Sequence, residues 1–461
     1  MAVKVWVSAL AAMGAFCVVG GNSPFADPDC GSCRPILTHI VAPREAIDLC
    51  GEWDYHHGLK TDKFTDAGLK WSKTTVPASL SFGIWKNPPK PSDAMYRRTF
   101  TLTKEQSAKH AELFFEQACF DTYVYVNGNL AYKSYDWSTP FRFDVTPFVK
   151  KGENTLEVRC FVAPDHPDGK DAPAVPGWVW GNETGISRPV HLELSDPVHI
   201  AWARVDPQVT PEKKLRVTVA VTNGSARASC SVLRASCEGW KNEGKVELKA
   251  WEQREVVLEK AWPEAHLWNP DDPFLYNLEL KFGDCDALRV RFGFREFRIE
   301  GRHVTLNGHP FINRRDTVGL GTSSAKEGVD VVDAKMREMV RLYKSRGLVG
   351  MRTGPSTLYR ELEVCDEMGF LVSPLLPTGA GYSRNPPYWS AVSNMVRRAA
   401  EAYRNHPSMT YWCLFNEFGK NYGVGTWKEQ YPKMVAMGDY LKTFEPTTFW
   451  TSCGDTELDP E

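Results

Sequence analysis

Residues 405–417 read NHPSMTYWCLFNE, and this stretch determines how the last third of the chain is interpreted. The turn signal Asn-His-Pro precedes an apolar run at 409–415 that is short and rich in aromatic residues. Such a run predicts a buried β-strand. The strand ends on Asn416 and Glu417, so an amide and a carboxylate follow a segment that carries no charge.

The position of Glu417 indicates a chemical role. In a parallel α/β barrel the catalytic groups lie at the C-terminal ends of the strands, because the loops there form the pocket. A glutamate shielded from water by Trp412 and Phe415 would have a raised pKa and could serve as a general acid. The alternative is a glutamate at the barrel rim that only forms a salt bridge with a neighbour.

Strand and helix patterns alternate on both sides of this stretch. Helices are predicted at 331–346, 356–368, 389–404 and 431–444, and strands at 311–318, 348–353, 370–376, 409–417 and 447–453. Apolar side chains recur on one face of the first helix, as Met336, Val340 and Tyr343 illustrate. We therefore expect residues 299–461 to be the N-terminal half of a TIM (β/α)8 barrel, which closes only with eight strands.

The chain before residue 299 carries strand patterns without a convincing helix. Within 40–196, the alternating segment TYVYV at 122–126 leads into Asn127-Gly128, a strong hairpin signal. Within 197–298, LRVTVAVT at 215–222 leads into Asn223-Gly224. The first region predicts an antiparallel jelly-roll sandwich, and the second an immunoglobulin-like sandwich without chemistry of its own.

Composition limits the function classes. The chain has 461 residues, of which 42% are hydrophobic and 24% charged, as expected of a soluble multidomain protein. Its net charge of −2 gives no reason to expect nucleic acid or an anionic membrane surface as a partner. Sixteen tryptophans are compatible with stacking on sugar rings, although packing in sandwich cores is the favoured role for most of them.

The N-terminus resembles an export signal. Lys4 precedes an apolar run at 5–19, and small and polar residues follow, so residues 1–22 are predicted to be a signal peptide. The run is too short to span a bilayer, and no other stretch qualifies. We expect a periplasmic or extracellular protein.

Of its 12 cysteines, Cys119, Cys160, Cys230, Cys365 and Cys413 lie in apolar runs and are predicted to be packing residues. The CGSC at 30–33 favours a local disulfide or linker thiols over a redox or metal site.

Three motifs in a fixed order resemble the jelly-roll domain of glycoside hydrolase family 2. They are VYVNG at 124–128, STPFRFDVTPFVKKGENTLEV at 138–158 and GNETGISRPVHLEL at 181–194. LWNPDDPFLYNLEL at 267–280 and RFGFREFRIEG at 291–301 resemble the end of the family's second domain and its entry into the barrel. The family includes β-galactosidases, β-glucuronidases and β-mannosidases.

The resemblance implies roles for three residues. Glu417 matches the acid/base glutamate that ends strand four, and Asn416 matches the residue that binds the sugar hydroxyl next to the anomeric carbon. Arg352 matches the arginine that ends strand two and supports the nucleophile, with a rim ion pair as its alternative. Asp316 is a weaker candidate, and Asp366 is expected to be structural.

Two departures leave the sugar unidentified. Thr-Gly-Pro follows Arg352 where the family often has His-Tyr-Pro, and NRRDTVGLG at 313–321 lacks a histidine expected near the pocket.

The resemblance thus implies a retaining β-glycosidase that acts on oligo- or polysaccharides without an organic cofactor or an identifiable metal site. Hydrolysis with retention of the anomeric configuration needs a second carboxylate about 5 Å from the acid/base carboxylate. The family's nucleophile, at the end of strand seven, would lie beyond residue 461. Two alternatives stay open: a secreted, non-catalytic carbohydrate-binding protein with a vestigial barrel, and an enzyme completed by a partner chain. A homo-oligomer is equally open.

Overall fold

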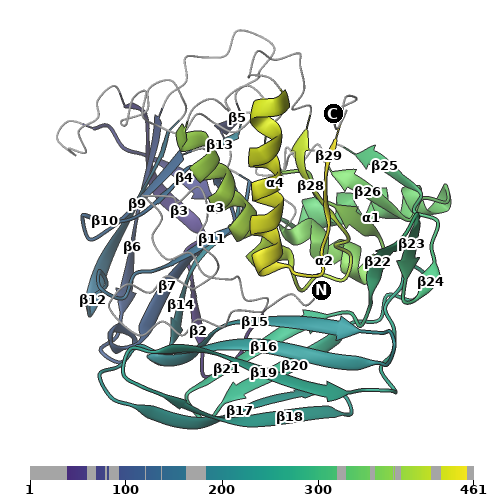
Figure 1. Cartoon of the computed structure of the whole chain (residues 1–461). Helices are drawn as coiled ribbons and strands as arrows, with labels where there is room; N and C mark the ends of the chain where they lie inside the picture. The colour runs from purple at the N-terminus through teal and green to yellow at the C-terminus, as the bar shows by residue number, and fades with distance from the viewer. Residues whose placement is uncertain are drawn as a thin grey trace.

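The computed structural model describes residues 39–59, 69–77, 80–81, 93–119, 121–136, 138–161, 183–318, 329–353, 359–376, 378, 386–416 and 427–453. These residues form two β-sandwiches followed by alternating strands and helices (Figure 1). The predicted signal peptide and the CGSC motif lie outside the described residues. Within the described ranges, no helix is long and apolar enough to cross a bilayer.

The first sandwich packs a six-stranded sheet, in the order β10-β9-β12-β6-β3-β4, against a four-stranded sheet, in the order β11-β7-β14-β2. A small third sheet has the order β5-β13-β8. All of these strand pairs are antiparallel. The elements are β2 (Glu45–Asp48), β3 (Gly51–Leu59), β4 (Ser72–Val76), β5 (Leu80–Ser81), β6 (Asp93–Leu102), the 3-10 helix η1 (Gln106–Ala108), β7 (His110–Phe115), β8 (Ala118–Cys119), β9 (Asp121–Val126), β10 (Asn129–Ser134), β11 (Phe141–Asp144), β12 (Gly152–Phe161), β13 (Glu183–Ile186) and β14 (Val190–Ser195).

Aromatic side chains fill the core of this sandwich. The rings of Phe115 and Phe141 stack with centroids 4.9 Å apart, and those of Tyr132 and Phe143 stack at 4.4 Å. The predicted hairpin between β9 and β10 is present, with positive φ at both Asn127 and Gly128. A two-residue turn of this kind matches the right-handed twist of the flanking strands, which is why Asn-Gly is favoured there.

The second sandwich packs sheet β1-β21-β20-β17-β18 against sheet β15-β16-β19. Its strands are β1 (His39–Ile40), β15 (Val198–Gln208), β16 (Lys214–Asn223), β17 (Ser229–Cys237), β18 (Trp240–Leu248), β19 (Gln253–Ala261), β20 (Tyr276–Phe282) and β21 (Asp286–Phe292). Strand β1 precedes the first sandwich in the chain, yet it pairs with β21 of the second. Arg44 reinforces this crossing through a buried ion pair with Asp286, 2.6 Å between Nη2 and Oδ2.

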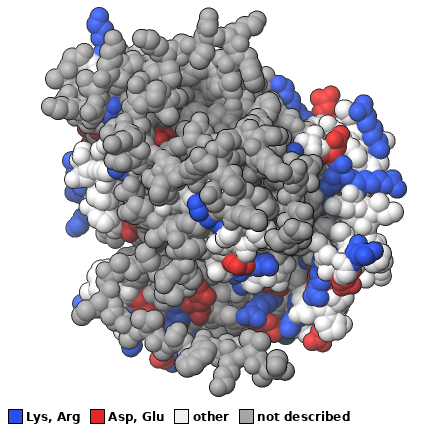
Figure 2. Space-filling model, turned by 45° about the horizontal axis from the view of Figure 1, so that its top comes forward, with Lys and Arg blue, Asp and Glu red and all other residues white. Residues whose placement is uncertain are grey.

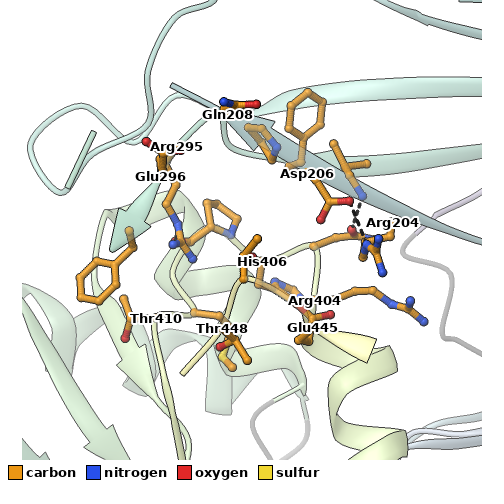
Figure 3. Close-up of a pocket in the computed structure, with 18 of the residues that line it drawn as sticks. Arg204, Asp206, Gln208, Arg295, Glu296, Arg404, His406, Thr410, Glu445 and Thr448 are labelled. Carbon is orange, nitrogen blue, oxygen red and sulfur yellow. Dashed lines mark hydrogen bonds and ion pairs between the residues drawn. The ribbon is translucent and has the colours of Figure 1, made fainter. Parts of the chain in front are cut away.

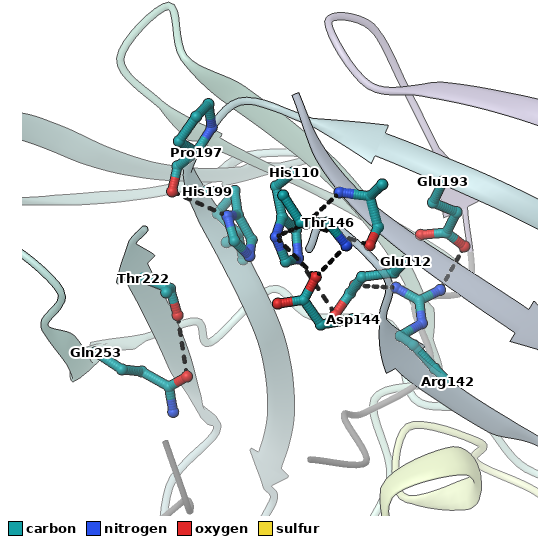
Figure 4. Close-up of polar contacts among 12 residues, drawn as sticks. His110, Glu112, Arg142, Asp144, Thr146, Glu193, Pro197, His199, Thr222 and Gln253 are labelled. Atoms are coloured by element: carbon teal, nitrogen blue, oxygen red, sulfur yellow. Dashed lines mark hydrogen bonds and ion pairs between the residues drawn. The ribbon is translucent and has the colours of Figure 1, made fainter. Parts of the chain in front are cut away.

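Polar side chains line the outer face of the four-stranded sheet (Figure 4). Arg142 is fully buried and donates to Glu112 and Glu193, which come from the two strands beyond it in the sheet. His110 stacks on His199 of the second sandwich, with ring centroids 4.3 Å apart. Phe114 belongs to the core of the following βα units. Strand β7 is therefore covered on both faces, and all of its residues are buried.

The remaining chain alternates strands and helices. It begins with the antiparallel strands β22 (Phe297–Glu300), β23 (His303–Leu306) and β24 (His309–Pro310). The βα units are β25 (Arg315–Val318), α1 (Val329–Ser345), β26 (Gly350–Thr353), α2 (Tyr359–Met368), β27 (Leu371–Ser373), α3 (Pro386–Tyr403), β28 (Trp412–Asn416), α4 (Trp427–Phe444) and β29 (Trp450–Cys453).

The strands of these units are parallel and follow chain order. Strands β25, β26 and β27 form one parallel sheet, and β28 pairs in parallel with β29. Parallel bridges from Val372 to Met409 and from Leu375 to Cys413 join the two groups. This order agrees with the predicted βα series. Closure into an eight-stranded barrel stays a prediction.

One cysteine corrects the packing interpretation. Cys119, Cys160, Cys365 and Cys413 are buried as predicted, and Cys413 is also disulfide-bonded, but Cys230 is exposed on β17. On the face shown in Figure 2, the described basic and acidic side chains are interspersed. That distribution fits the small net charge of −2.

Candidate active site

The ends of three parallel strands bring polar side chains together. Nη1 of Arg352, on β26, donates a hydrogen bond of 3.2 Å to Oδ1 of Asn416, on β28. Nε of Arg352 also donates to Oγ1 of Thr317, on β25, at 3.5 Å. Arg352 and Asn416 are both half-buried. The two residues singled out in the sequence are thus direct neighbours, although 64 positions separate them.

Strand β28 carries Asn416 to this position because its preceding residues are held in the core. Trp412, Cys413, Leu414 and Phe415 are buried, whereas Asn416 is partly exposed. The ring of Phe415 lies 6.2 Å from that of Trp389 on α3. Burying an aromatic or aliphatic side chain of this kind contributes about 1.5–3 kcal/mol. An out-of-register strand would lose that contribution, so packing fixes where the polar end emerges.

Thr378 tethers the end of the strand. Its carbonyl oxygen accepts the backbone N–H of Asn416 at 3.4 Å. Its hydroxyl group donates to the carbonyl oxygen of Leu414. On the other side, the register between β28 and β29 shifts between Cys413 and Phe415. A bulge of this kind re-aims the side chains that follow it.

Glu417, the predicted acid/base residue, lies outside the described residues. Its neighbours in sequence are placed: Trp412 stacks on Tyr403, with ring centroids 6.0 Å apart, and Phe415 is fully buried. The proximity of Arg352 and Asn416 therefore locates the end of β28, and the role of Glu417 stays a prediction.

The two weaker candidates have different environments. Asp316 is exposed on β25. Asp366 is buried on α2 and accepts hydrogen bonds from Nδ1 of His406 at 2.5 Å and from the hydroxyl group of Ser408 at 2.6 Å. These contacts tie α2 to the turn that precedes β28, at the opposite end of the strand from Asn416. These contacts indicate a structural role for Asp366.

Sequence reasoning did not single out Thr317 or Thr378. Threonine is common in and beside strands, so neither residue has a distinctive sequence signal. Within the described ranges, His, Cys, Asp and Glu side chains form no group of three or more that could hold a metal ion. Among the described residues of this site, the functional groups in contact are a guanidinium group, an amide and a hydroxyl group.

Family models match both sandwiches. Residues 89–187 match the model described as "Glycosyl hydrolase 2 galactose-binding domain-like", and residues 198–295 match "Glycosyl hydrolases family 2". The chain is 25% identical over 426 residues to "Beta-galactosidase BoGH2A" of Bacteroides ovatus, covering 84% of this chain and 48% of that protein. It spans from 34% to 48% of the length of three curated relatives that it matches.

Solved structures share the fold. A GH2 beta-galacturonidase from Eisenbergiella tayi superposes with a TM-score of 0.76 at 21% identity, covering 90% of this chain and 73% of that one. Beta-glucuronidase 2 of Bacteroides uniformis superposes with a TM-score of 0.74 at 22% identity, covering 89% and 52%.

Proposed function

Because residues 89–187 and 198–295 are domains of glycosyl hydrolase family 2, we propose that the chain is the N-terminal part of a retaining β-glycosidase. The observation that carries this proposal is the hydrogen bond between Arg352 and Asn416, directly before Glu417. The substrate is a terminal β-glycosidic bond of an oligo- or polysaccharide. The names of similar proteins mention galactosidase, glucuronidase and galacturonidase activities, so the sugar is left open.

The proposed reaction proceeds in two steps. Glu417 first protonates the glycosidic oxygen while a second carboxylate attacks the anomeric carbon and forms a glycosyl-enzyme. Glu417, now ionised, then removes a proton from the water that hydrolyses this intermediate. The nucleophile is a second carboxylate, and no residue is assigned to it. The two carboxyl groups of a retaining enzyme lie about 5–5.5 Å apart.

In this proposal Asn416 binds the substrate and Arg352 binds the nucleophile. Arg352 engages Oδ1 of Asn416, which leaves the amide NH2 group as a donor to the hydroxyl next to the anomeric carbon. A guanidinium group has five N–H donors, so Arg352 can also bind the nucleophile carboxylate. Fixed donors of this kind stabilise charge that develops in the transition state.

A panel of aryl β-glycosides tests the proposal. The chain, a version extended by its downstream coding sequence, and the extended Glu417→Gln variant are assayed side by side. We expect activity only in the extended protein and its loss in Glu417→Gln. Retention of activity in Glu417→Gln would remove the acid/base assignment. The proposed export is tested by N-terminal sequencing of the secreted protein. We expect the residues before position 23 to have been removed.

A carbohydrate-binding protein is the second candidate, because residues 89–187 match a galactose-binding domain-like model. It predicts that the extended protein binds glycans yet hydrolyses none of the glycosides. Restoration of activity only after mixing with a separate chain would instead indicate a split enzyme.

A further inference from the structure

A separate cavity of about 810 Å³ lies at the opposite end of the parallel strands (Figure 3). It is lined by β15, by the segment that joins β21 to β22, by the turn before β28 and by the segment after α4. Thr410 lines it, six positions before Asn416. At about 3.3 Å per residue, roughly 20 Å of chain separates the cavity from the candidate active site.

Several charged side chains of the lining already have partners. Nε of Arg204 lies 2.8 Å from a carboxylate oxygen of Asp206, as Figure 3 shows. Arg298 pairs with Glu296 in the same way. Lys214 lies 3.1 Å from Glu259. These groups need no ligand to balance their charge.

Two arginines of the lining lack a carboxylate partner within the described part of the chain. Nε of Arg295 donates to the carbonyl oxygen of Pro407 at 2.7 Å, and no further hydrogen bond of this guanidinium is found there. Nε of Arg404 donates to the carbonyl oxygen of Glu401, and its guanidinium lies 4.8 Å from the ring centroid of Trp202. Burial lowers the pKa of Arg295 to about 10 and also lowers the pKa of Arg404.

Two further polar groups of the lining are left without a partner among the described residues. His406 is 4% exposed and uses Nδ1 to bind Asp366, while its Nε2 is buried and unpaired. Oε1 of Glu445 is also buried and unpaired. Burial raises the pKa of Glu445 to about 7, although Arg404 and Arg204 oppose the rise. An unsatisfied buried polar atom costs about 1–3 kcal/mol, so two such atoms around one cavity call for an explanation.

We propose that this cavity binds a small organic carboxylate, of up to sugar-acid size, through the guanidinium groups of Arg295 and Arg404, with Nε2 of His406 as a further hydrogen-bonding group. The described lining carries six basic side chains and four acidic ones, a net charge of +2 (6 − 4) that favours an anionic ligand; these are Arg204, Lys214, Arg216, Arg295, Arg298 and Arg404, and Asp206, Glu259, Glu296 and Glu445. The planar fork of a guanidinium matches a carboxylate. The volume falls within the range of about 300–1,000 Å³ found for small-molecule pockets.

Titration calorimetry with sodium D-glucuronate, sodium acetate and neutral D-glucose tests the proposal. The experiment uses the Arg352→Gln variant of the whole chain, so that the candidate active site does not contribute. We expect glucuronate to bind and glucose not to bind. If acetate binds as tightly as glucuronate, the site recognises simple carboxylates. If acetate binds much more weakly, the site recognises sugar acids. Binding of glucose as tight as that of glucuronate would overturn the proposal.

Substitutions locate the binding. Adding Arg295→Gln or Arg404→Gln should weaken glucuronate binding at least about tenfold, as expected when one partner of a buried charge pair is lost. Arg298→Gln serves as the matched control, because Arg298 already pairs with Glu296, and it should leave the affinity within about twofold. Unchanged binding in both of the first two variants would contradict the proposal.

A melting experiment separates binding from folding. Arg295→Gln removes a buried cation that has no carboxylate at ion-pair distance among the described residues, so its melting temperature without ligand should equal or exceed that of the parent. Glucuronate should raise the melting temperature of the parent and not that of the variant. A variant that melts far below the parent, yet keeps the glucuronate shift, would show a purely structural arginine. All of these outcomes are independent of glycosidase activity.

Discussion

Arg352 acts through a geometry that lysine cannot reproduce. Its guanidinium reaches Asn416 through Nη1 and Thr317 through Nε, from one rigid plane. We expect Arg352→Lys to lower kcat/KM of the extended enzyme by about 100-fold, because a displaced positioning group costs that much. Steady-state kinetics on an aryl glycoside checks this. The exposed Arg346→Lys is the control and should match the parent; equal losses in both variants would refute a specific role for Arg352.

Asp366 is expected to govern stability. Its buried carboxylate accepts hydrogen bonds from Nδ1 of His406 and from both the N–H and the hydroxyl group of Ser408. Asp366→Asn replaces one acceptor oxygen by an amino group, so the free energy of unfolding should fall by about 2–4 kcal/mol. Urea denaturation measures the loss. The exposed Asp316→Asn should change it by less than about 0.5 kcal/mol, and a similar effect of both would contradict the structural role.

Single residues differ in how far the sequence reveals them. Asn416 stands out because it ends an apolar strand, whereas Arg352 is singled out only by the resemblance of its segment to the family's second strand. Thr378 does not stand out, because its bonds to β28 depend on how two βα units are aligned. The lack of a carboxylate partner for Arg295 among the residues that the structure describes had no sequence signal. It results from the packing of the second sandwich against a turn more than 100 positions further along the chain.

Helix α4 contains a glycine that its packing requires. A Cβ atom on Gly438 would lie 1.8 Å from Nε1 of Trp450 on β29. Alanine favours a helix by about 1 kcal/mol over glycine, but here the clash should dominate. We expect Gly438→Ala to lower the melting temperature by several degrees, measured by circular dichroism. Lys442→Ala, at an exposed position of the same helix, should leave it nearly unchanged. A higher melting temperature for Gly438→Ala would show that Trp450 moves aside without cost.

Helix α2 is attached to the first sandwich by buried charges. Nε of Arg360 donates to Glu116 at 3.1 Å, and Arg188 donates to Glu361 at 2.7 Å. Burial raises the pKa of Glu116 to about 7, against the opposing effect of Arg360 and Arg188. The folded protein therefore holds this proton over a pH range in which the unfolded chain, with a pKa near 4.5, has released it.

The pH dependence follows from this difference. The contribution of Glu116 to stability is fully present below about pH 4.5 and is lost as the pH rises towards 7. Relative to the parent, Glu116→Gln should gain up to about 3 kcal/mol between pH 4.5 and pH 7.5. Urea denaturation of both proteins across this range checks the trend. A difference that stays constant with pH would contradict it.

Element types could be predicted from periodicity, but their ends could not. The predicted strand at 409–417 is observed as Trp412–Asn416, because the backbone of Thr410 bonds to Val372 before β28 pairs with β29. The sequence predicts the last helix at 431–444. The helix instead begins at Trp427, with Pro432 inside it.

At the scale of the whole molecule, the N-terminal segment joins the two sandwiches. Arg44 bonds both oxygens of Asp286, whose Oδ2 also accepts the N–H of Ile200. Arg44→Met leaves a buried carboxylate without its cation and should destabilise the protein by about 3–5 kcal/mol. Differential scanning calorimetry should show a lower first transition. Lys73→Met, whose ion pairs are largely exposed, should leave the transition nearly unchanged; equal effects would argue against the linking role.

The order of β-rich and βα regions could be predicted, because each is encoded in local periodicity. The contact surfaces between them could not. Strand β7 is buried on both faces, and its polar members are balanced by Arg142 and by His199, which lie on other strands. Such an interface depends on partners distant in the chain, and single-sequence periodicity contains no information about them. For the same reason, the pairing of β1 with the second sandwich could not be predicted from the sequence.

The exposed position of Cys230 has a practical consequence. This thiol lies on β17, in the sandwich to which no chemistry is assigned, whereas Cys119, Cys160 and Cys365 are buried. A maleimide reagent under native conditions should therefore modify Cys230 ahead of those three. The second sandwich thus supplies an attachment point through which the protein can be coupled to a solid support.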